Sequence, residues 1–177
     1  GSLLGLYKIL KSVVSNNCDI KMITPNEGNK NQLYFLDGID QIINFQQNPD
    51  TCIDAFTNTN LIIGLDFNEP NRIDTLEPYF MQSNAYKILI DHHHNPKTEC
   101  FDTTISKPEM SSTCELVFWI VDSIWKADVI TKDAAIPLYC GICTDTGTFS
   151  YSNIHPSLYV ATASLVSHDI EPDKLQI

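Results

Sequence analysis

The sequence is poor in glycine, and this scarcity excludes the common nucleotide-binding classes. The seven glycines are Gly1, Gly5, Gly28, Gly38, Gly64, Gly141 and Gly147. They cannot form the G-x-G-x-x-G motif of dinucleotide-binding folds or the phosphate loop G-x-x-x-x-G-K. The chain also has no G-x-S-x-G motif, the turn that carries the nucleophile of many serine hydrolases. A Rossmann cofactor, a P-loop nucleotide and a serine nucleophile of that type are therefore excluded.

Positive charge is scarce as well. The 177 residues carry 11 Lys+Arg against 22 Asp+Glu, for a net charge of -11, and Arg72 is the only arginine. An acidic surface repels polyphosphates, and one guanidinium cannot form a phosphate-reading face, so an extended DNA-binding surface is excluded. Any nucleic-acid substrate would need metal ions as intermediaries. Arg72 is a candidate contact to a substrate phosphate, with a structural ion pair as the alternative.

Long apolar runs and dense cysteine frameworks are also missing. No apolar run approaches the roughly 20 residues of a membrane-spanning helix, and the start of the chain does not resemble a signal peptide. The six scattered cysteines are not the framework of a small secreted domain, so a reducing cytoplasm is the expected location. Cys140 and Cys143 are expected to pack in a core. One soluble domain is predicted, with no membrane partner and with a homodimer left open.

Two short apolar runs predict buried parallel strands that end in polar residues. The run Leu61–Leu65 stops at Asp66, and the run Tyr86–Ile90 stops at the D-H-H-H sequence of residues 91–94. A third strand is expected at 101–105. Ligands of open parallel sheets bind beyond the carboxyl ends of the strands, so Asp66 and the histidine cluster are expected to converge there.

Helical periodicity predicts helices that alternate with these strands. A short strand at 20–24 and a turn at 25–28 are also expected, while residues 30–58 stay open between short helices and strands. The alternation predicts an α/β fold, with a mostly parallel sheet flanked by helices on both faces. The predicted helices are 2–16, 72–84, 112–125 behind a Ser112/Glu115 capping box, 131–143, and 156–166 behind Pro156.

The polar cluster has the composition of a metal site. Carboxylates mixed with imidazoles suit Mn²⁺, Mg²⁺ or Co²⁺ better than a thiolate zinc site. Two ions about 3.5–4 Å apart would generate hydroxide and clamp a phosphoryl group, which predicts metal-assisted phosphoester hydrolysis. Taken singly, each residue has a simpler reading: a solvated loop for the histidines, a turn residue for Asp66, and a helix-ending turn for Asp145 before Gly147.

Several ordered motifs resemble one family. Residues 90–93, Ile-Asp-His-His, resemble the signature of the DHH phosphoesterases, and Asp66 and residues 144–147 stand where two other motifs of that family stand. The resemblance covers nearly all of the chain. The chain most resembles the bacterial nanoRNase and pAp-phosphatase branch of the family. The motifs that carry this resemblance are residues 65–68, 111–113, 141–149 and 151–153.

The resemblance implies roles for individual residues. Asp66 would bridge two ions, and His92 and Asp145 would complete the coordination of one of them. His93 would lie against the scissile phosphate, and Asp91 would orient an imidazole from behind, as histidine ligands generally require. The catalytic set implied in this way is Asp91, His92 and His93. An extra histidine at position 94 leaves a one-residue shift of these roles open.

Two parts of the family pattern have no counterpart in the 177 residues. The first strand of the family carries an H-x-x-x-D-x-D motif, and residues 1–6 resemble the G-S-x-x-G-L that follows it. The C-terminal substrate-binding domain, with its Gly-rich motif, has no counterpart after Ile177. We therefore expect residues 1–177 to form a DHH catalytic domain without that first strand and that second domain, and to be inactive by themselves.

The resemblance also implies a function. The implied function is that of a metal-dependent phosphoesterase, which hydrolyses short oligoribonucleotides, pAp or linear dinucleotides. Two Mn²⁺ ions would activate the attacking water, with Mg²⁺ or Co²⁺ as alternatives. A family II inorganic pyrophosphatase and a RecJ-like single-strand exonuclease are the enzymatic alternatives. A catalytically inactive nucleotide-binding module is the alternative from another class. Residues 111–113 and 146–149 favour the nanoRNase branch.

Overall fold

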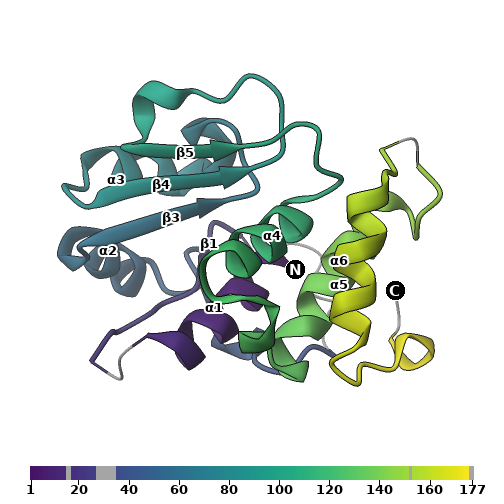
Figure 1. Cartoon of the computed structure of the whole chain (residues 1–177). Coiled ribbons are helices and arrows are strands. Elements are labelled where there is room, and N and C mark those ends of the chain that lie inside the picture. The colour runs from purple at the N-terminus through teal and green to yellow at the C-terminus, as the bar shows by residue number, and fades with distance from the viewer. Residues whose placement is uncertain (15–16, 27–34, 152, 176–177) are drawn as a thin grey trace.

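Three parallel strands lie side by side in the computed structural model, which describes residues 1–14, 17–26, 35–151 and 153–175 (Figure 1). They are β3 (Leu61–Leu65), β4 (Tyr86–Asp91) and β5 (Thr103–Ser106), in the order β3-β4-β5. A second parallel pair, β1 (Ile23–Thr24) and β2 (Ile43–Asn44), forms its own small sheet. The predicted α/β class with parallel pairing is confirmed, although the strands fall into two sheets within the described residues.

Helices cover both faces of the three-stranded sheet. Neighbouring residues of β3 point to opposite faces, and accordingly Ile62 packs in one hydrophobic cluster and Ile63 in another. The Ile62 face is covered by α2 and α3, and the Ile63 face by α4 with α1, α5 and α6 behind it (Figure 1). The helices are α1 (Ser2–Val13), α2 (Pro49–Asn58), α3 (Glu77–Gln82), α4 (Thr113–Trp125), α5 (Lys132–Thr146) and α6 (Pro156–Val166).

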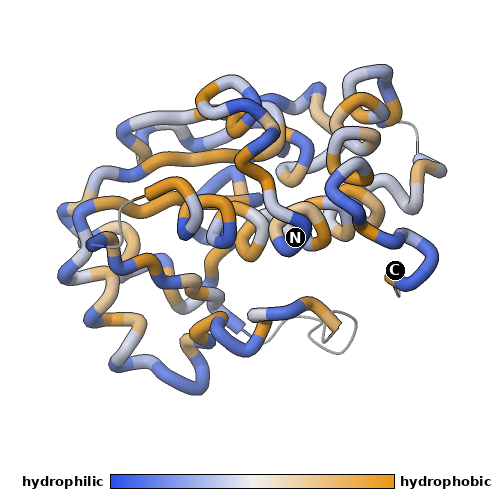
Figure 2. The backbone as a smooth tube through the Cα atoms, turned by 60° about the horizontal axis from the view of Figure 1, so that its bottom comes forward, coloured by the Kyte–Doolittle hydropathy of each residue, from blue (hydrophilic) through white to orange (hydrophobic). Residues whose placement is uncertain are grey.

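Hydrophobic residues are concentrated in the regular elements, and polar residues in many of the segments that connect them (Figure 2). Figure 2 shows the hydrophobic residues, in orange, along the strands and the helices that cover them, while many connecting segments are blue. Short 3₁₀ helices complete the connections, at Ile39–Gln41, Pro70–Leu76, Thr98–Cys100, Ala127–Val129 and Pro172–Lys174. No helix in the described parts of the chain combines the length and the apolar character that crossing a membrane requires.

The two predicted strands differ in how deeply they are buried. The central strand β4 ends in Leu89, Ile90 and Asp91, all buried, as expected for a strand covered on both faces. Strand β3 has only Gly64 buried, and Leu61 is exposed. The expectation of full burial was wrong for β3 because this strand lies at the edge of its sheet.

Several predicted element ends shift. The helix predicted at 2–16 ends at Val13, and the one predicted at 72–84 divides into a 3₁₀ segment and α3, with a kink at Asp74 where φ is 51°. Helix α5 continues past Cys143 to Thr146 and is capped by Gly147 in the left-handed conformation. Asp145 therefore lies in the last helical turn. Part of the turn predicted at 25–28 lies outside the described residues.

Helices α1, α4 and α5 approach one another closely at small residues. A Cβ on Gly5 of α1 would lie 2.6 Å from Cδ2 of Leu138 in α5, and a Cβ on Gly141 would lie 2.1 Å from Sγ of Cys114 in α4 and 3.2 Å from Cα of Gly1. The glycines at positions 1 and 5 are one helical turn apart, so they face the same neighbour. The G-S-x-x-G sequence is thus a helix-packing motif here.

The cysteines of α5 contribute to this packing. Cys140 and Cys143 are both free and buried, as predicted. Burial raises the pKa of Cys140 to about 11 and also raises that of Cys143. Both thiols therefore stay protonated near neutral pH, which does not suit a redox pair or a zinc site.

Replacing Gly141 by alanine should lower the free energy of unfolding by about 1–3 kcal/mol, the usual cost of overpacking a core. The new Cβ would overlap Sγ of Cys114, so α4 and α5 would have to separate. Chemical denaturation measures the loss. In a Cys114→Ala background part of it should be recovered, and an equal loss in both backgrounds would show that this contact is not the cause.

Candidate metal centre

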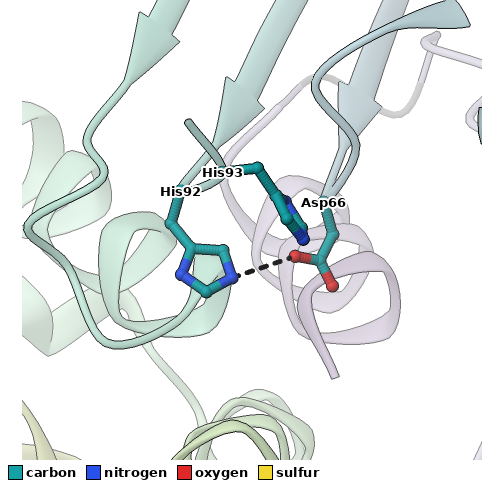
Figure 3. Close-up of side chains that lie close together, drawn as sticks. All are labelled: Asp66, His92 and His93. Carbon is teal, nitrogen blue, oxygen red and sulfur yellow. Dashed lines mark ion pairs between the residues drawn. The ribbon is translucent and has the colours of Figure 1, made fainter. Parts of the chain in front are cut away.

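Asp66, His92 and His93 come together at the carboxyl ends of β3 and β4. Strand pairing places Leu65 opposite Ile90, so the residues that follow each strand emerge next to each other. One ligand atom from each of the three side chains lies within 4.8 Å of the others (Figure 3). The convergence expected from the two strand ends is therefore observed.

His92 presents its outer nitrogen to Asp66. Its Nδ1 lies 3.3 Å from the carbonyl oxygen of Met110 and donates to it, which leaves the lone pair on Nε2. Nε2 lies 3.6 Å from Oδ1 of Asp66 (Figure 3). Two such atoms bound to one ion at 2.0–2.2 Å would lie roughly 3 Å apart, so a small movement brings both into coordination.

His93 is held in the same manner by a buried carboxylate. Asp91 is fully buried at the end of β4, and its Oδ1 lies 2.6 Å from Nδ1 of His93. Its Oδ2 accepts the backbone N–H of His93 at 3.0 Å. An acceptor on Nδ1 leaves Nε2 of His93 free, the usual arrangement of a histidine that ligates a metal. Asp91 was expected to orient an imidazole, and in the structure it contacts that of His93.

Asp66 itself adopts an uncommon backbone conformation. Its φ is 67°, in the left-handed region, which costs a non-glycine residue of order 1 kcal/mol or more and is concentrated at functional sites. The hydroxyl of Thr113 donates to Oδ1 of Asp66 at 2.7 Å. Asp66 is exposed, whereas the next residue, Phe67, is buried. The S-S-T sequence of 111–113 was recognised as a motif, but the role of Thr113 was not predicted.

Asp145 lies beside this group without being one of its three members. The last turn of α5 places its carboxyl group where burial, followed by the charge of Asp66, raises its pKa to about 6, while His92 and His93 act in the opposite direction. Its ligand atom is outside the 4.8 Å group, in which His93 stands instead. The ligand set Asp66, His92 and Asp145 therefore stays a prediction.

The donor set nevertheless fits a divalent cation. Two carboxylates repel each other across the site, and two imidazoles present lone pairs toward one of them. A cation bound among these groups would relieve the repulsion and satisfy the lone pairs. Oxygen and nitrogen donors without thiolate suit Mn²⁺, Mg²⁺ or Co²⁺.

The candidate phosphate contact, Arg72, lies apart from the cluster. Arg72 is exposed in the 3₁₀ helix Pro70–Leu76, and within the described residues no ion pair joins it to the group. The pKa of Glu69 is lowered first by its hydrogen bonds to Lys97 and Asn71 and also by the charge of Arg72. The phosphate contact of Arg72 stays a prediction.

Asn68 contributes to the site in a way that the sequence did not reveal. The side-chain amide of Asn68 donates to the main-chain carbonyl oxygen of His94 at 2.9 Å. The main-chain carbonyl oxygen of Asn68 accepts the backbone N–H of Lys97 at 2.8 Å. The loops that follow β3 and β4 are thereby joined. His94 is exposed and contributes its backbone to this junction, so the described ligand group contains positions 92 and 93 and not 94.

Known proteins are similar to this chain in sequence. Residues 1–142 match the model of the DHH family, N-terminal domain. The chain is 30% identical over 166 residues to the bifunctional oligoribonuclease and PAP phosphatase NrnA of Mycoplasma genitalium, covering 91% of this chain and 46% of that protein. It is 28% identical over 123 residues to the NrnA of Thermus thermophilus, covering 65% and 34%.

A solved structure is also similar. An exopolyphosphatase-related protein from Bacteroides fragilis superposes with a TM-score of 0.91 at 32% sequence identity, over 98% of this chain and 50% of that one. The chain thus spans half or less of the length of these relatives.

The metal-free protein should lose stability as the pH rises through the range in which Asp145 ionises. The folded-state pKa of about 6 lies above the ordinary 3.8, so the folded protein holds this proton more tightly and ionisation disfavours folding. Asp145→Asn should therefore be the more stable protein at about pH 8, by up to about 3 kcal/mol, and match the wild type below about pH 4. Urea unfolding at both pH values measures this.

Asp133→Asn, at an exposed position of the same helix, is the matched control for the loss of one carboxylate. Added Mn²⁺ should stabilise the wild type more than Asp145→Asn. A constant stability difference between wild type and Asp145→Asn at all pH values would contradict the prediction.

Proposed function

The chain belongs to the DHH family, and from this premise we propose that it contains the metal-binding part of a phosphoesterase that acts on short oligoribonucleotides, pAp or linear dinucleotides. The observation that carries the proposal is the convergence of Asp66 with His92 and His93 beyond two paired strands. Each imidazole is anchored through Nδ1 and turns Nε2 toward the shared space. This is a preorganised site for a cation, and its position matches the ligand-binding edge of parallel sheets.

The residues of the chain would divide the chemical work among themselves. Asp66, His92 and Asp145 would hold Mn²⁺, with Mg²⁺ or Co²⁺ as alternatives. The bound ion supplies a water of lowered pKa and positive charge for the phosphoryl oxygens. Thr113 keeps Oδ1 of Asp66 in place through its hydroxyl, so the carboxylate does not have to reorganise on binding.

His93 has the geometry of a group that contacts the substrate. The carboxylate of Asp91 accepts a hydrogen bond from Nδ1–H of His93 and so orients the ring. The side chain of His93 is partly exposed, while that of Asp91 is buried. When Nε2 is also protonated, His93 can donate to a phosphate oxygen, and the buried carboxylate of Asp91 compensates the charge. Asp91, His92 and His93 would together form the catalytic set.

The choice of substrate rests on the relatives and on charge. Two relatives are named as bifunctional oligoribonucleases and PAP phosphatases. A net charge of -11 disfavours long polyanions, which would require a cationic track. We therefore propose a nucleotide or a short oligonucleotide, bound mainly through the phosphate at the metal. Pyrophosphate hydrolysis, processive single-strand exonuclease activity and binding without catalysis are the competing outcomes.

We further propose that residues 1–177 form a DHH domain whose metal centre gains ligands from an added strand. Strand β3 pairs only with β4 among the described residues, and its other edge can accept a parallel strand. Gly1 packs against Gly141 of α5, the helix whose last turn carries Asp145. A segment joined to Gly1 would thus run beside the site, where the family places its H-x-x-x-D-x-D strand.

Mn²⁺ titration tests the ligand count. Residues 1–177 should bind at most one ion, weakly, and show no turnover, because the described part of the chain offers one ligand group, around Asp66. A longer chain with an H-x-x-x-D-x-D strand before Gly1 should bind two ions and be active. Calorimetry on both chains, with Asp145→Asn as control, measures the number of sites. Two tight sites or robust turnover in residues 1–177 would show that the ligands are misidentified.

Substrate preference tests the proposed class. The longer chain should hydrolyse dinucleotides to pentanucleotides, or pAp, at least tenfold faster than long single-stranded RNA or pyrophosphate. Initial rates with Mn²⁺ on equal molar amounts of each substrate measure the preference. Equal rates on long strands would favour the exonuclease, a preference for pyrophosphate would favour the pyrophosphatase, and binding without turnover would favour the inactive module.

A further inference from the structure

A carboxylate outside the metal centre is fully buried and holds many hydrogen bonds. Glu115 lies in the first turn of α4 and has no exposed surface. The predicted cap is present in part, because the Ser112 hydroxyl accepts the N–H of Glu115 at 3.0 Å. The Glu115 carboxylate binds one residue earlier than a capping box requires: its Oε2 accepts both the N–H and the hydroxyl of Ser111, at 2.9 and 2.8 Å.

The same carboxylate joins α4 to a segment far along the chain. Ser157, 42 positions away, donates to Oε1 at 3.3 Å, and Nε2 of His155 lies 3.4 Å from Oε2. The amide of Asn153 donates to the carbonyl oxygen of Ser111 at 2.9 Å. Trp119 adds a longer contact of 3.4 Å to Oε1. Burying a carboxylate is costly unless donors surround it, and this one is surrounded by them.

The segment that Glu115 anchors also contacts two members of the metal cluster. Met110, directly before Ser111, accepts the Nδ1 proton of His92 through its carbonyl oxygen. Thr113, two residues after Ser111, donates to Asp66. Glu115 therefore fixes the middle of a four-residue segment whose two ends set the tautomer of one ligand and the carboxylate position of another.

From this geometry we propose that Glu115 is a positioning residue for the metal centre, acting through Ser111 on His92 and Asp66. The proposal rests on the proposed function in one respect, that this cluster binds a divalent cation. Glu115 touches neither the cation nor the substrate. Its partners Ser157 and His155 make the position of the 110–113 segment dependent on the chain that follows α5.

A role confined to stability is the alternative, and two measurements separate it from positioning. A stability role lowers the unfolding temperature without altering the folded site. A positioning role also changes the tautomer of His92 and weakens cation binding in protein that is fully folded. Glu115→Gln keeps the size of the side chain but turns an NH₂ group toward donors, so it disturbs the Ser111 contacts with little change in volume.

Nitrogen NMR of the metal-free protein provides the first measurement. The wild type should show His92 protonated at Nδ1, and Glu115→Gln should show a mixture of tautomers. Calorimetric titration with Mn²⁺, well below the unfolding temperature, provides the second. Affinity should fall about tenfold in Glu115→Gln, at the lower end of the usual effect of residues that support metal ligands.

The matched control is Val121→Ala, at a fully buried position of the same helix. It should lower the unfolding temperature and leave the His92 tautomer and Mn²⁺ affinity unchanged within twofold. If Glu115→Gln does not fold, Ser111→Ala removes one of the donors and should weaken Mn²⁺ binding about threefold, with the same change at His92.

The outcomes distinguish this inference from the proposed function. A wild type that binds Mn²⁺, together with Glu115 and Ser111 variants that keep its affinity and the Nδ1 tautomer, would overturn the positioning role alone. A wild type that binds no Mn²⁺ would overturn the metal centre and this inference together. A tautomer change in Glu115→Gln without loss of affinity would overturn the claim that the segment controls cation binding.

Discussion

The parallel pairing of β3 with β4 is the constraint on which the site depends. Its register puts Leu65 opposite Ile90, so a carboxylate and two imidazoles leave the sheet at the same edge. Parallel strands need a crossover between them, which here contains α3 and covers one face, while α4 covers the other. A one-residue slip of this register would turn every side chain of one strand to the opposite face and separate Asp66 from His92.

The site is a concentration of negative charge held in place by donors. Asp91 and Glu115 are buried carboxylates: Asp91 accepts two N–H groups of His93, and Glu115 accepts the N–H and the hydroxyl of Ser111. Asp66 and Asp145 have fewer donors and repel each other, which contributes to the raised pKa of Asp145. The fold thus stabilises Asp91 and Glu115, while Asp66 and Asp145 keep the repulsion that the proposed cation would relieve. This division is what a cation-binding site requires before the cation arrives.

Close helix packing determines where Asp145 can lie. The glycines of α1 and α5 allow the helices to approach, and Cys140 of α5 packs in one hydrophobic cluster with Leu4 of α1. Helix α5 then reaches the site with its last turn, which carries Asp145. The side chain of Glu115 connects the chain after this helix back to α4. The position of Asp145 therefore depends on contacts among α1, α4 and α5 as well as on the strand ends.

Local patterns in the sequence predicted several of the strands and helix starts and the sheet edge at which the site lies. The apolar runs ending at Asp66 and Asp91 predicted both strands and their meeting at one edge, Pro156 marked the start of α6, and Ser112 caps α4 as its position indicated. These features depend on residues within a few positions of one another. The approach of His93 to Asp66, the Ser111 partner of Glu115 and the junction made by Asn68 were decided only by the tertiary structure. Each depends on how helices and loops dock across long stretches of chain, because side-chain distances of a few ångströms follow from packing and not from spacing along the sequence.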